Sequence, residues 1–318
     1  MFAEIFTPEL FASAVRLATP IALAAVGASI CERSGVVNIA MEGLMLIGAF
    51  SGVVTALITG STWLGVLGAV VGAMIFASLH AWASVNLRAD QVISGTAINI
   101  LALGTTGFLM ETIFGHPGTT NPVRTIRPVF DFPTGGDGPL ATAWIWIDTV
   151  FLSYTPIVYF GMFMAVFLTW ALYRTRWGLR LRSLGEHPRA ADTVGINVKK
   201  GRWFAVLVSG FMSGLAGANL TLEQVGSFTE GMTNGRGFIA LAAMIFGRWI
   251  PGGGYLASLL FGFADALQLK LQLFSEVIRI PAQFFLMLPY PLTVIVLAGV
   301  VGRAVAPAAV GKPYDKNN

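Results

Sequence analysis

Five polar side chains lie inside long apolar stretches, and their types suit hydrogen bonding to a polar solute. They are Asn38, Glu42, Asn99, Asp265 and Gln268. A polar or ionisable side chain within a membrane-spanning segment is energetically costly, so by default it indicates a functional site. Amides and carboxylates at these positions predict a substrate path and no catalytic centre.

Glu42 is the strongest of these candidates. It lies about seven residues, or roughly 10 Å at 1.5 Å per residue, inside an expected membrane helix over 36–59. Asn38 precedes it by four residues, so a helix would present both side chains on one face. The alternative is that both groups hydrogen-bond neighbouring helices, and the residues alone leave the two interpretations open. For Asn99, expected at a similar depth, an interhelical hydrogen bond is the preferred interpretation.

A polar stripe is expected on a later segment, because Asp265, Gln268 and Gln272 are spaced i, i+3, i+7. It either lines the path or packs against a partner protein. A weak internal similarity also joins residues 35–49 to 231–247, since each begins Gly-x-x-Asn and continues as a glycine-rich apolar run. Such corresponding segments can mark a transporter site, but coincidence explains so few identities equally well.

A second group of residues suits docking to another protein. Residues 174–202 carry eight of the twenty Lys and Arg residues, arranged around the phrase GEHPRAADTVG. Pro188 suits the first turn of a helix, and Gly195 suits a left-handed stop. The phrase predicts a two-turn surface helix that docks a partner, although positive charge that merely sets topology is the alternative. The expected coupling residues lie on this helix or at its ends: Glu186, His187, Pro188, Arg189, Ala190, Asp192 and Gly195.

The whole chain is apolar enough to consist of membrane helices. Its 318 residues are 55% hydrophobic and 11% charged, whereas a soluble domain has about 25% charged residues. We expect an all-α polytopic membrane protein with about 8–9 transmembrane helices, one of them short or re-entrant, and a cytoplasmic coupling helix. The expected segments are 10–30, 36–59, 63–85, 92–114, 150–173, 203–223, 238–249, 255–274 and 283–301.

Charge predicts the orientation of a single transmembrane domain over 1–318. Basic residues favour the cytoplasmic side of membrane spans, which makes 174–202 a cytoplasmic coupling loop and 304–318 a cytoplasmic tail. The stretch at 115–149 becomes an outer loop, either a lid or a passive connector. If 238–249 crosses, the N-terminus lies outside and the C-terminus in the cytoplasm. Basic loops beside membrane spans account for the high pI, so no nucleic-acid partner is expected.

Nothing in the chain indicates an enzyme. Cys31 is the only cysteine, and His80, His116 and His187 are scattered, so no metal or other cofactor is expected. The phosphate-binding pattern G-x-x-x-x-G-K-[ST] is missing from the sequence. Either another polypeptide hydrolyses ATP or ATP is not used.

Four stretches together resemble one family of membrane proteins. They are ERSGVVNIAMEGLMLIGAFSG at 32–52, DQVISGTAIN at 90–99, GLRLRSLGEHPRAADTVGINVKKGR at 178–202 and GFIALAAMIFGRWIPGGG at 237–254. The chain resembles ABC-importer permeases of the branched-chain amino acid, ribose and nucleoside group, over nearly its whole length. Residues 32–52 and 90–99 are most similar to the nucleoside permeases of the simple-sugar branch.

The resemblance implies a multi-pass permease subunit of a bacterial inner (plasma) membrane importer for nucleosides, which works by alternating access. It also implies three protein partners besides membrane lipid: an ATP-binding cassette subunit that hydrolyses ATP and receives the short helix, a second permease (a related chain or a copy of this one), and an extracytoplasmic substrate-binding protein. The alternatives are an ABC permease for simple sugars or branched-chain amino acids and, less favoured, an ion-coupled secondary transporter.

Overall fold

The computed structural model describes residues 5–130, 139–273, 284, 287, 291 and 304–315. Within these ranges the secondary structure is helical, and extended backbone pairs only at an isolated bridge between Thr119 and Thr229. Seven helices of the described chain are long and apolar enough to span a membrane. The predicted all-α polytopic membrane protein is therefore confirmed, while the segment expected at 283–301 lies almost entirely outside the described residues.

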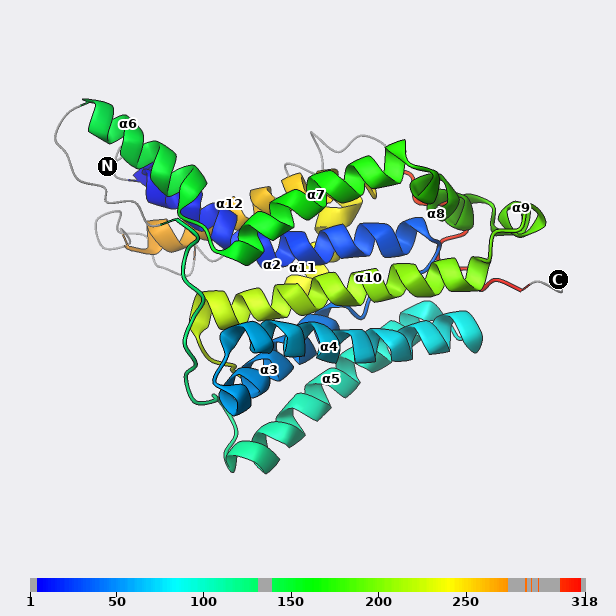
Figure 1. Ribbon diagram of the computed structural model, residues 1–318, viewed down its shortest axis with the longest axis horizontal. Helices are drawn as coiled ribbons and strands as arrows, with labels where there is room; N and C mark the ends of the chain where they lie inside the picture. The colour runs from blue at the N-terminus through cyan, green and yellow to red at the C-terminus, as the bar shows by residue number, and fades with distance from the viewer. Residues whose placement is uncertain are drawn as a thin grey trace.

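Shorter helices lie between the membrane-length helices or continue them (Figure 1). The long helices are α2 (Pro8–Arg33), α3 (Met41–Thr59), α4 (Thr62–Ala81), α5 (Gln91–Phe114), α7 (Pro156–Arg174), α10 (Val198–Ala218) and α12 (Pro251–Leu273). The shorter α-helices are α6 (Pro139–Ile147), α8 (Arg176–Glu186), α9 (Pro188–Thr193) and α11 (Arg236–Phe246). Three π-helical turns, η1 (Trp82–Asn86), η2 (Asp148–Leu152) and η3 (Asn219–Val225), directly continue α4, α6 and α10.

The core is built around α2, which is buried without a break from Ala18 to Glu32. This part of α2 is rich in alanine, and small residues let neighbouring helices approach closely. Where α12 crosses α2, a Cβ added to Gly262 would lie 2.5 Å from the Cβ of Ala18. In contrast, α5 lies at the edge of the bundle with many exposed side chains, as expected of a helix that faces lipid (Figure 1).

The two ends of the bundle carry different segments (Figure 1). One end holds α8, α9 and tail residues 304–315, and we call it the α9 end. The other holds α6 and the first turns of α2, and we call it the α6 end. Residues 174–202 bring eight of the twenty Lys and Arg residues to the α9 end.

The helix predicted over 36–59 begins later than expected, at Met41. Residues 34–40 are not helical, so the prediction that Asn38 and Glu42 share a helix face is wrong. Gly35 has a φ of +92°, which starts the break. The Asn38 side chain then accepts a hydrogen bond from the N–H of Ala40 at 3.1 Å. Such local side-chain bonds compete with helical hydrogen bonding.

The short segment predicted at 238–249 corresponds to α11. Before it, residues 226–235 are not helical and begin at the α6 end, where the N–H of Val123 donates to Gly226 at 2.7 Å. After it, the carbonyl of Trp249 accepts from Arg33 at the end of α2, at 2.9 Å. The chain therefore passes from the α6 end to the α9 end, with a helix only in the second half of the passage.

The loop predicted at 115–149 is not wholly irregular, because α6 lies within it and η2 begins at Asp148. The apolar run PLATAWIWI at the end of this stretch forms α6. Glycine, proline and threonine, which favour turns, are concentrated before α6.

Candidate substrate path and coupling surface

Glu42 lies where the starts of α3 and α11 meet. Its carboxylate accepts hydrogen bonds from the N–H groups of Gly235 and Gly237 at 2.8 and 2.7 Å. The first turn of a helix has free N–H groups and a positive dipole, so a carboxylate is stabilised there. A Cβ on Gly237 would lie 2.5 Å from the Cα of Glu42. Only glycine permits this approach.

The two predicted asparagines stabilise the start of α3. The Asn99 side chain accepts from the N–H of Gly43 at 2.8 Å and donates to the Ile39 carbonyl at 3.0 Å. Asn38 is fully buried and donates to the Ser209 hydroxyl at 2.9 Å. Asn38, Glu42 and Asn99 with these partners form a single contact region, which we call the junction. Its side chains hydrogen-bond to other protein groups, which is the structural interpretation left open above.

The two stretches of similar sequence, 35–49 and 231–247, meet at the junction. In each, a non-helical lead is followed by the start of a helix, α3 in the first and α11 in the second. The other two predicted path residues lie on α12. Asp265 and Gln268 are partly buried, and Asp265 is within electrostatic range of Arg236, the first residue of α11.

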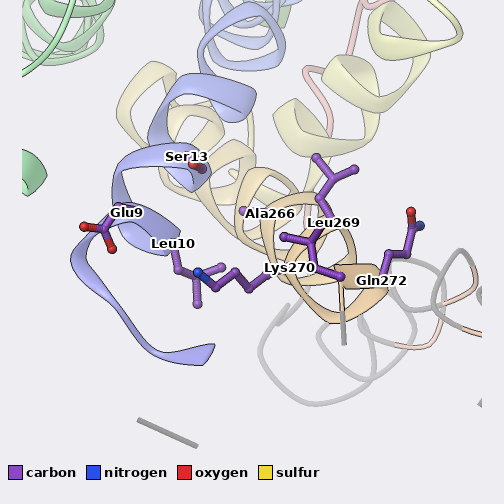
Figure 2. A pocket seen from close by; sticks show the side chains of 8 residues that line it. Glu9, Leu10, Ser13, Ala266, Leu269, Lys270 and Gln272 are labelled. Carbon is purple, nitrogen blue, oxygen red and sulfur yellow. The ribbon is translucent and has the colours of Figure 1, made fainter. Parts of the chain in front are cut away.

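Two cavities open at the α6 end, and none of the five predicted path residues lines either of them. The first, of about 550 Å³, lies between the start of α2 and the end of α12. Glu9 and Ser13 reach it from α2, and Lys270 and Gln272 from α12 (Figure 2). The second, of about 490 Å³, shares Ser13 and Leu269 with the first.

The second cavity contains a carboxylate that the sequence reasoning missed. Glu223 accepts hydrogen bonds from the hydroxyl of Thr155 at 2.6 Å, the N–H of Ile157 at 3.1 Å and the amide of Asn219 at 2.5 Å. Ile157 lies in the first turn of α7, so Glu223 stabilises that helix start as Glu42 stabilises α11. An acidic residue at the end of the apolar run 203–223 was the signal that could have identified it.

At the α9 end, the predicted coupling helix is present. It begins at Pro188, and Gly195 has a φ of +82°. The N–H of Gly195 donates to Asp192 and that of Ile196 to Ala191, both at 3.0 Å, which is the hydrogen-bond pattern of a Schellman motif. The sequence GEHPRAADTVG therefore forms a helix with the start and the stop that were predicted.

The face that α9 presents is both basic and apolar. Ala191 is buried and packs the helix onto the protein, whereas Arg189 and Ala190 are exposed. Val194, which the sequence reasoning did not select, is 74% exposed. Of the remaining predicted coupling residues, some are exposed and others partly buried: Glu186, His187 and Gly195 in the first group, Pro188 and Asp192 in the second.

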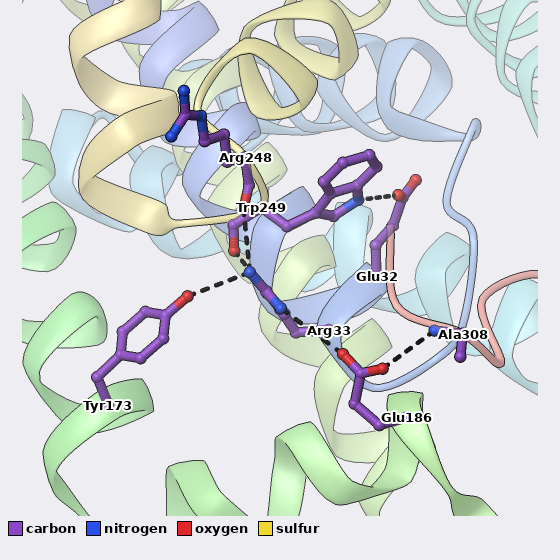
Figure 3. A network of polar contacts seen from close by, with 7 residues as sticks. All are labelled: Glu32, Arg33, Tyr173, Glu186, Arg248, Trp249 and Ala308. Carbon is purple, nitrogen blue, oxygen red and sulfur yellow. Dashed lines mark hydrogen bonds and ion pairs between the residues drawn. The ribbon is translucent and has the colours of Figure 1, made fainter. Parts of the chain in front are cut away.

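Arg33, at the end of α2, contacts α7, the turn after α11 and Glu186, the last residue of α8 (Figure 3). It donates to the carbonyls of Trp249 and Arg248 at 2.9 and 3.0 Å and to the hydroxyl of Tyr173 at 3.1 Å. Its guanidinium also lies 4.0 Å from the carboxylate of Glu186, two residues before α9. We call this group the Arg33 hub. It joins α2, α7, the α11–α12 turn and the approach to α9.

The turn between α11 and α12 is strained. Arg248 and Trp249 have φ values of +57° and +55°, which are unfavourable for large side chains. The Arg33 hub stabilises them, and the indole N–H of Trp249 also donates to Glu32 at 2.6 Å. Strained backbone that is retained by several contacts is common where a protein changes shape.

A bundle of membrane-length helices with a surface helix tied to its interior is the architecture of a transport permease, a class without a catalytic centre of its own. The chain belongs to the family described as branched-chain amino acid transport system/permease component, whose profile matches residues 10–299. It is therefore a multi-pass membrane protein and a transport subunit. ABC permeases of this kind work with ATP-binding and substrate-binding subunits.

Several similar proteins are named as guanosine or nucleoside permeases. The chain is 42% identical to the guanosine ABC transporter permease protein NupQ of Bacillus subtilis, over 94% of each protein. It is 41% identical to the nucleoside ABC transporter permease protein NupC of Lactococcus lactis, again over 94% of each. A second guanosine permease protein of Bacillus subtilis, NupP, is 24% identical over 78% of this chain and 70% of NupP.

Proposed function

We propose that this chain is the permease subunit of an ATP-driven nucleoside importer in a bacterial inner membrane. The names of NupQ and NupC support nucleosides as the substrate class. The observation that carries the proposal is the Arg33 hub, because Arg33 hydrogen-bonds to the α11–α12 turn and to α7 and lies 4.0 Å from Glu186, which ends α8 two residues before the exposed helix α9. A docking helix is useful only if its movement reaches the substrate path.

In this proposal residues 1–318 form one permease domain, with the α9 end in the cytoplasm. The N-terminus then lies outside and the C-terminus inside. The basic residues of 174–202 support this orientation, since positive charge favours the cytoplasmic side. The described chain also begins and ends at opposite ends of the bundle (Figure 1).

An ATP-binding subunit would hydrolyse ATP and move α9 through Glu186, His187, Pro188, Arg189, Ala190, Asp192 and Gly195. Arg33 would pass that movement to the turn at 248–249. From this turn α11 leads directly to Glu42, over 11 residues or about 16 Å. The helix would act as a short lever between the Arg33 hub and the junction.

The junction would be the closed gate of the path in this conformation. Opening it requires α11 to withdraw from Glu42, and the strained turn after α11 is the place where that movement can begin. The predicted path residues then have two roles. Asn38, Glu42 and Asn99 hold the gate, and Asp265 and Gln268 line the route beside it.

The second permease is proposed to be a related chain. Two guanosine permease proteins, NupQ and NupP, occur in Bacillus subtilis, and this chain is similar to both. That observation favours a pair of unlike permeases over two copies of one. A substrate-binding protein would deliver the nucleoside at the α6 end.

Arg189→Glu tests the coupling role, and Arg189→Lys is the matched control. We expect the Glu variant to reduce ATP-dependent guanosine uptake into vesicles by about ten-fold or more, because a docked charge is reversed. Membrane insertion, assayed in the same vesicles, should be unchanged, and the Lys variant should retain most uptake. Normal uptake by Arg189→Glu would contradict the docking role, and uptake that survives loss of ATP hydrolysis would contradict the proposed function.

A further inference from the structure

The cavity that contains Glu223 has the properties of a small-molecule site. Its volume of about 490 Å³ lies within the range of roughly 300–1,000 Å³ that is typical of ligand pockets. Its lining includes both apolar side chains, such as those of Leu17 and Leu269, and polar side chains. Ligand pockets commonly combine an apolar wall with a few oriented polar groups.

The polar groups of the cavity are held in place by an irregular helix. Asn219, Glu223 and Gln224 all belong to η3, a π-helical continuation of α10. The Gln224 amide donates to Asn219 at 2.8 Å and to the Arg16 carbonyl at 3.0 Å. π-helical turns are rare and occur often at functional sites. Here the turn brings three polar side chains to the cavity within six residues.

Charges of both signs reach this cavity. The Glu223 carboxylate lies at one part of its wall, and Arg16 and Arg127 line it as well. Arg16 donates to the carbonyl of Ser153 at 3.1 Å, which holds its guanidinium beside the start of α7. Hydroxyl groups and heterocycle edges, which both donate and accept hydrogen bonds, suit such a mixed lining.

The neighbouring cavity extends the site toward the end of α12. Ser13 and Leu269 line both cavities, so the two cavities are adjacent. The first cavity adds Glu9, Lys270 and Gln272 as polar groups (Figure 2). Together the two cavities form a vestibule with a mixed polar and apolar lining at the α6 end.

We propose that the cavity beside η3 is the outer binding site for the transported nucleoside, an inference that rests on the proposed function. The ribose hydroxyls would hydrogen-bond to Glu223 and Gln224, which are partly exposed and are held by buried Asn219. The flat base would pack against Leu17 and Leu269.

One helix, α7, links the proposed binding site to the α9 end. Glu223 is hydrogen-bonded to Thr155 and Ile157 at the start of α7. Near the other end of α7, Tyr173 is hydrogen-bonded to Arg33. A nucleoside that tightens the contacts of Glu223 would therefore change the position of a helix that ends at the Arg33 hub.

Thiol labelling of the assembled transporter tests the site. The only natural cysteine, Cys31, is buried, so an introduced cysteine gives a clean signal. Thr125→Cys places a thiol in the lining of the cavity, and Thr112→Cys places one on the exposed end of α5 as the control. A membrane-impermeant thiosulfonate is the reagent and guanosine the protecting ligand.

At guanosine concentrations roughly ten times its Kd, labelling of Thr125→Cys should slow about ten-fold, and labelling of Thr112→Cys should not change. ATP-dependent uptake without this protection would overturn the proposed site and leave the proposed function standing. Protection without ATP-dependent uptake would overturn the proposed function and support the site.

A second variant fills the cavity without removing a hydrogen bond assigned here. Ser13→Phe places a ring where the two cavities meet, and Ser13→Ala is its control. We expect the KM of guanosine uptake to rise about ten-fold in the Phe variant, with the same amount of transporter in the membrane. An unchanged KM in the Phe variant would overturn the site.

Discussion

Glu42 and Glu223 are both carboxylates inside membrane-length helices, and both accept hydrogen bonds from the backbone at the start of another helix. Their surroundings differ. At Glu42, the approach of Gly237 leaves no room for a Cβ, whereas Glu223 lines a cavity of about 490 Å³. An ionisable residue in a span marks an important position, but the space beside it decides whether a solute can bind there.

We therefore infer that the two carboxylates have different roles along one path. The site beside Glu223 would hold the solute and the junction beside Glu42 would block its passage. In this account α11 and α7 connect both regions to the Arg33 hub. Variants that change the unfolding midpoint and the uptake separately test these two roles.

The largest effect is expected for Gly237→Ala. The new Cβ would lie 2.5 Å from the Cα of Glu42, and backbone cannot move aside as a flexible side chain does. Overpacking costs about 1–3 kcal/mol and sometimes more, and we expect the upper end. Thermal unfolding of the purified transporter should show a clear fall in midpoint.

Gly104→Ala is the control for that variant. Gly104 lies on exposed α5, and a Cβ there would have nothing within 4 Å. Because alanine is favoured over glycine in a helix by about 0.5–1 kcal/mol, the midpoint should stay constant or rise. Equal midpoints for Gly237→Ala and Gly104→Ala would show that the junction is not tightly packed.

A smaller and more selective effect is expected when each carboxylate is removed. Glu42→Ala leaves the N–H groups of Gly235 and Gly237 without their acceptor; Gly235 is only partly buried, so one buried group is left unsatisfied, at about 1–3 kcal/mol. In Glu223→Ala, cavity water can replace the lost acceptor. Unfolding midpoints should therefore fall more for Glu42→Ala, whereas guanosine protection of Thr125→Cys should be lost only in Glu223→Ala. The reverse pattern would contradict the assignment of gate and site.

The sequence predicted the features that nearby residues determine and missed those that depend on distant segments of the chain. The ends of α9 were predicted because Pro188 and Gly195 determine them within one short phrase. Asn38, Glu42 and Asn99 were selected as polar residues of the spans and the structure brings them together, but the predicted helix face shared by Asn38 and Glu42 was wrong. The break before α3 is stabilised from afar, for example by Gly311, whose N–H donates to the Gly35 carbonyl at 3.2 Å.

The cavity beside η3 was missed for the same physical reason. Its lining comes from separate segments of the chain, represented by Ser13, Thr125, Thr155 and Asn219. Neither a local periodicity nor a motif predicts a cavity between segments that are distant in the sequence. The π-helical geometry of η3 is likewise a result of packing, so the expected segment 203–223 was read as an ordinary helix.

The smallest effect on stability is expected for Glu186→Gln at the Arg33 hub. This variant removes only the ion contact with Arg33 and leaves the other hydrogen bonds of Arg33 in place, and an ion pair with an exposed partner is worth about 1 kcal/mol or less. Uptake driven by ATP should nevertheless fall several-fold, because α9 loses its connection to the α11–α12 turn. Guanosine should still protect Thr125→Cys. Arg174→Gln, an exposed arginine at the same end, is the control, and an equal loss of uptake in both variants would contradict a special role for the hub.

The most direct measurement is a cryo-electron microscopy structure of the assembled transporter with guanosine bound and its ATP-binding subunit inactive. The account predicts ligand density at η3, in contact with Glu223 or Gln224, while Glu42 still accepts the N–H groups of Gly235 and Gly237. Ligand density between Glu42 and α11, with the space beside η3 empty, would contradict it.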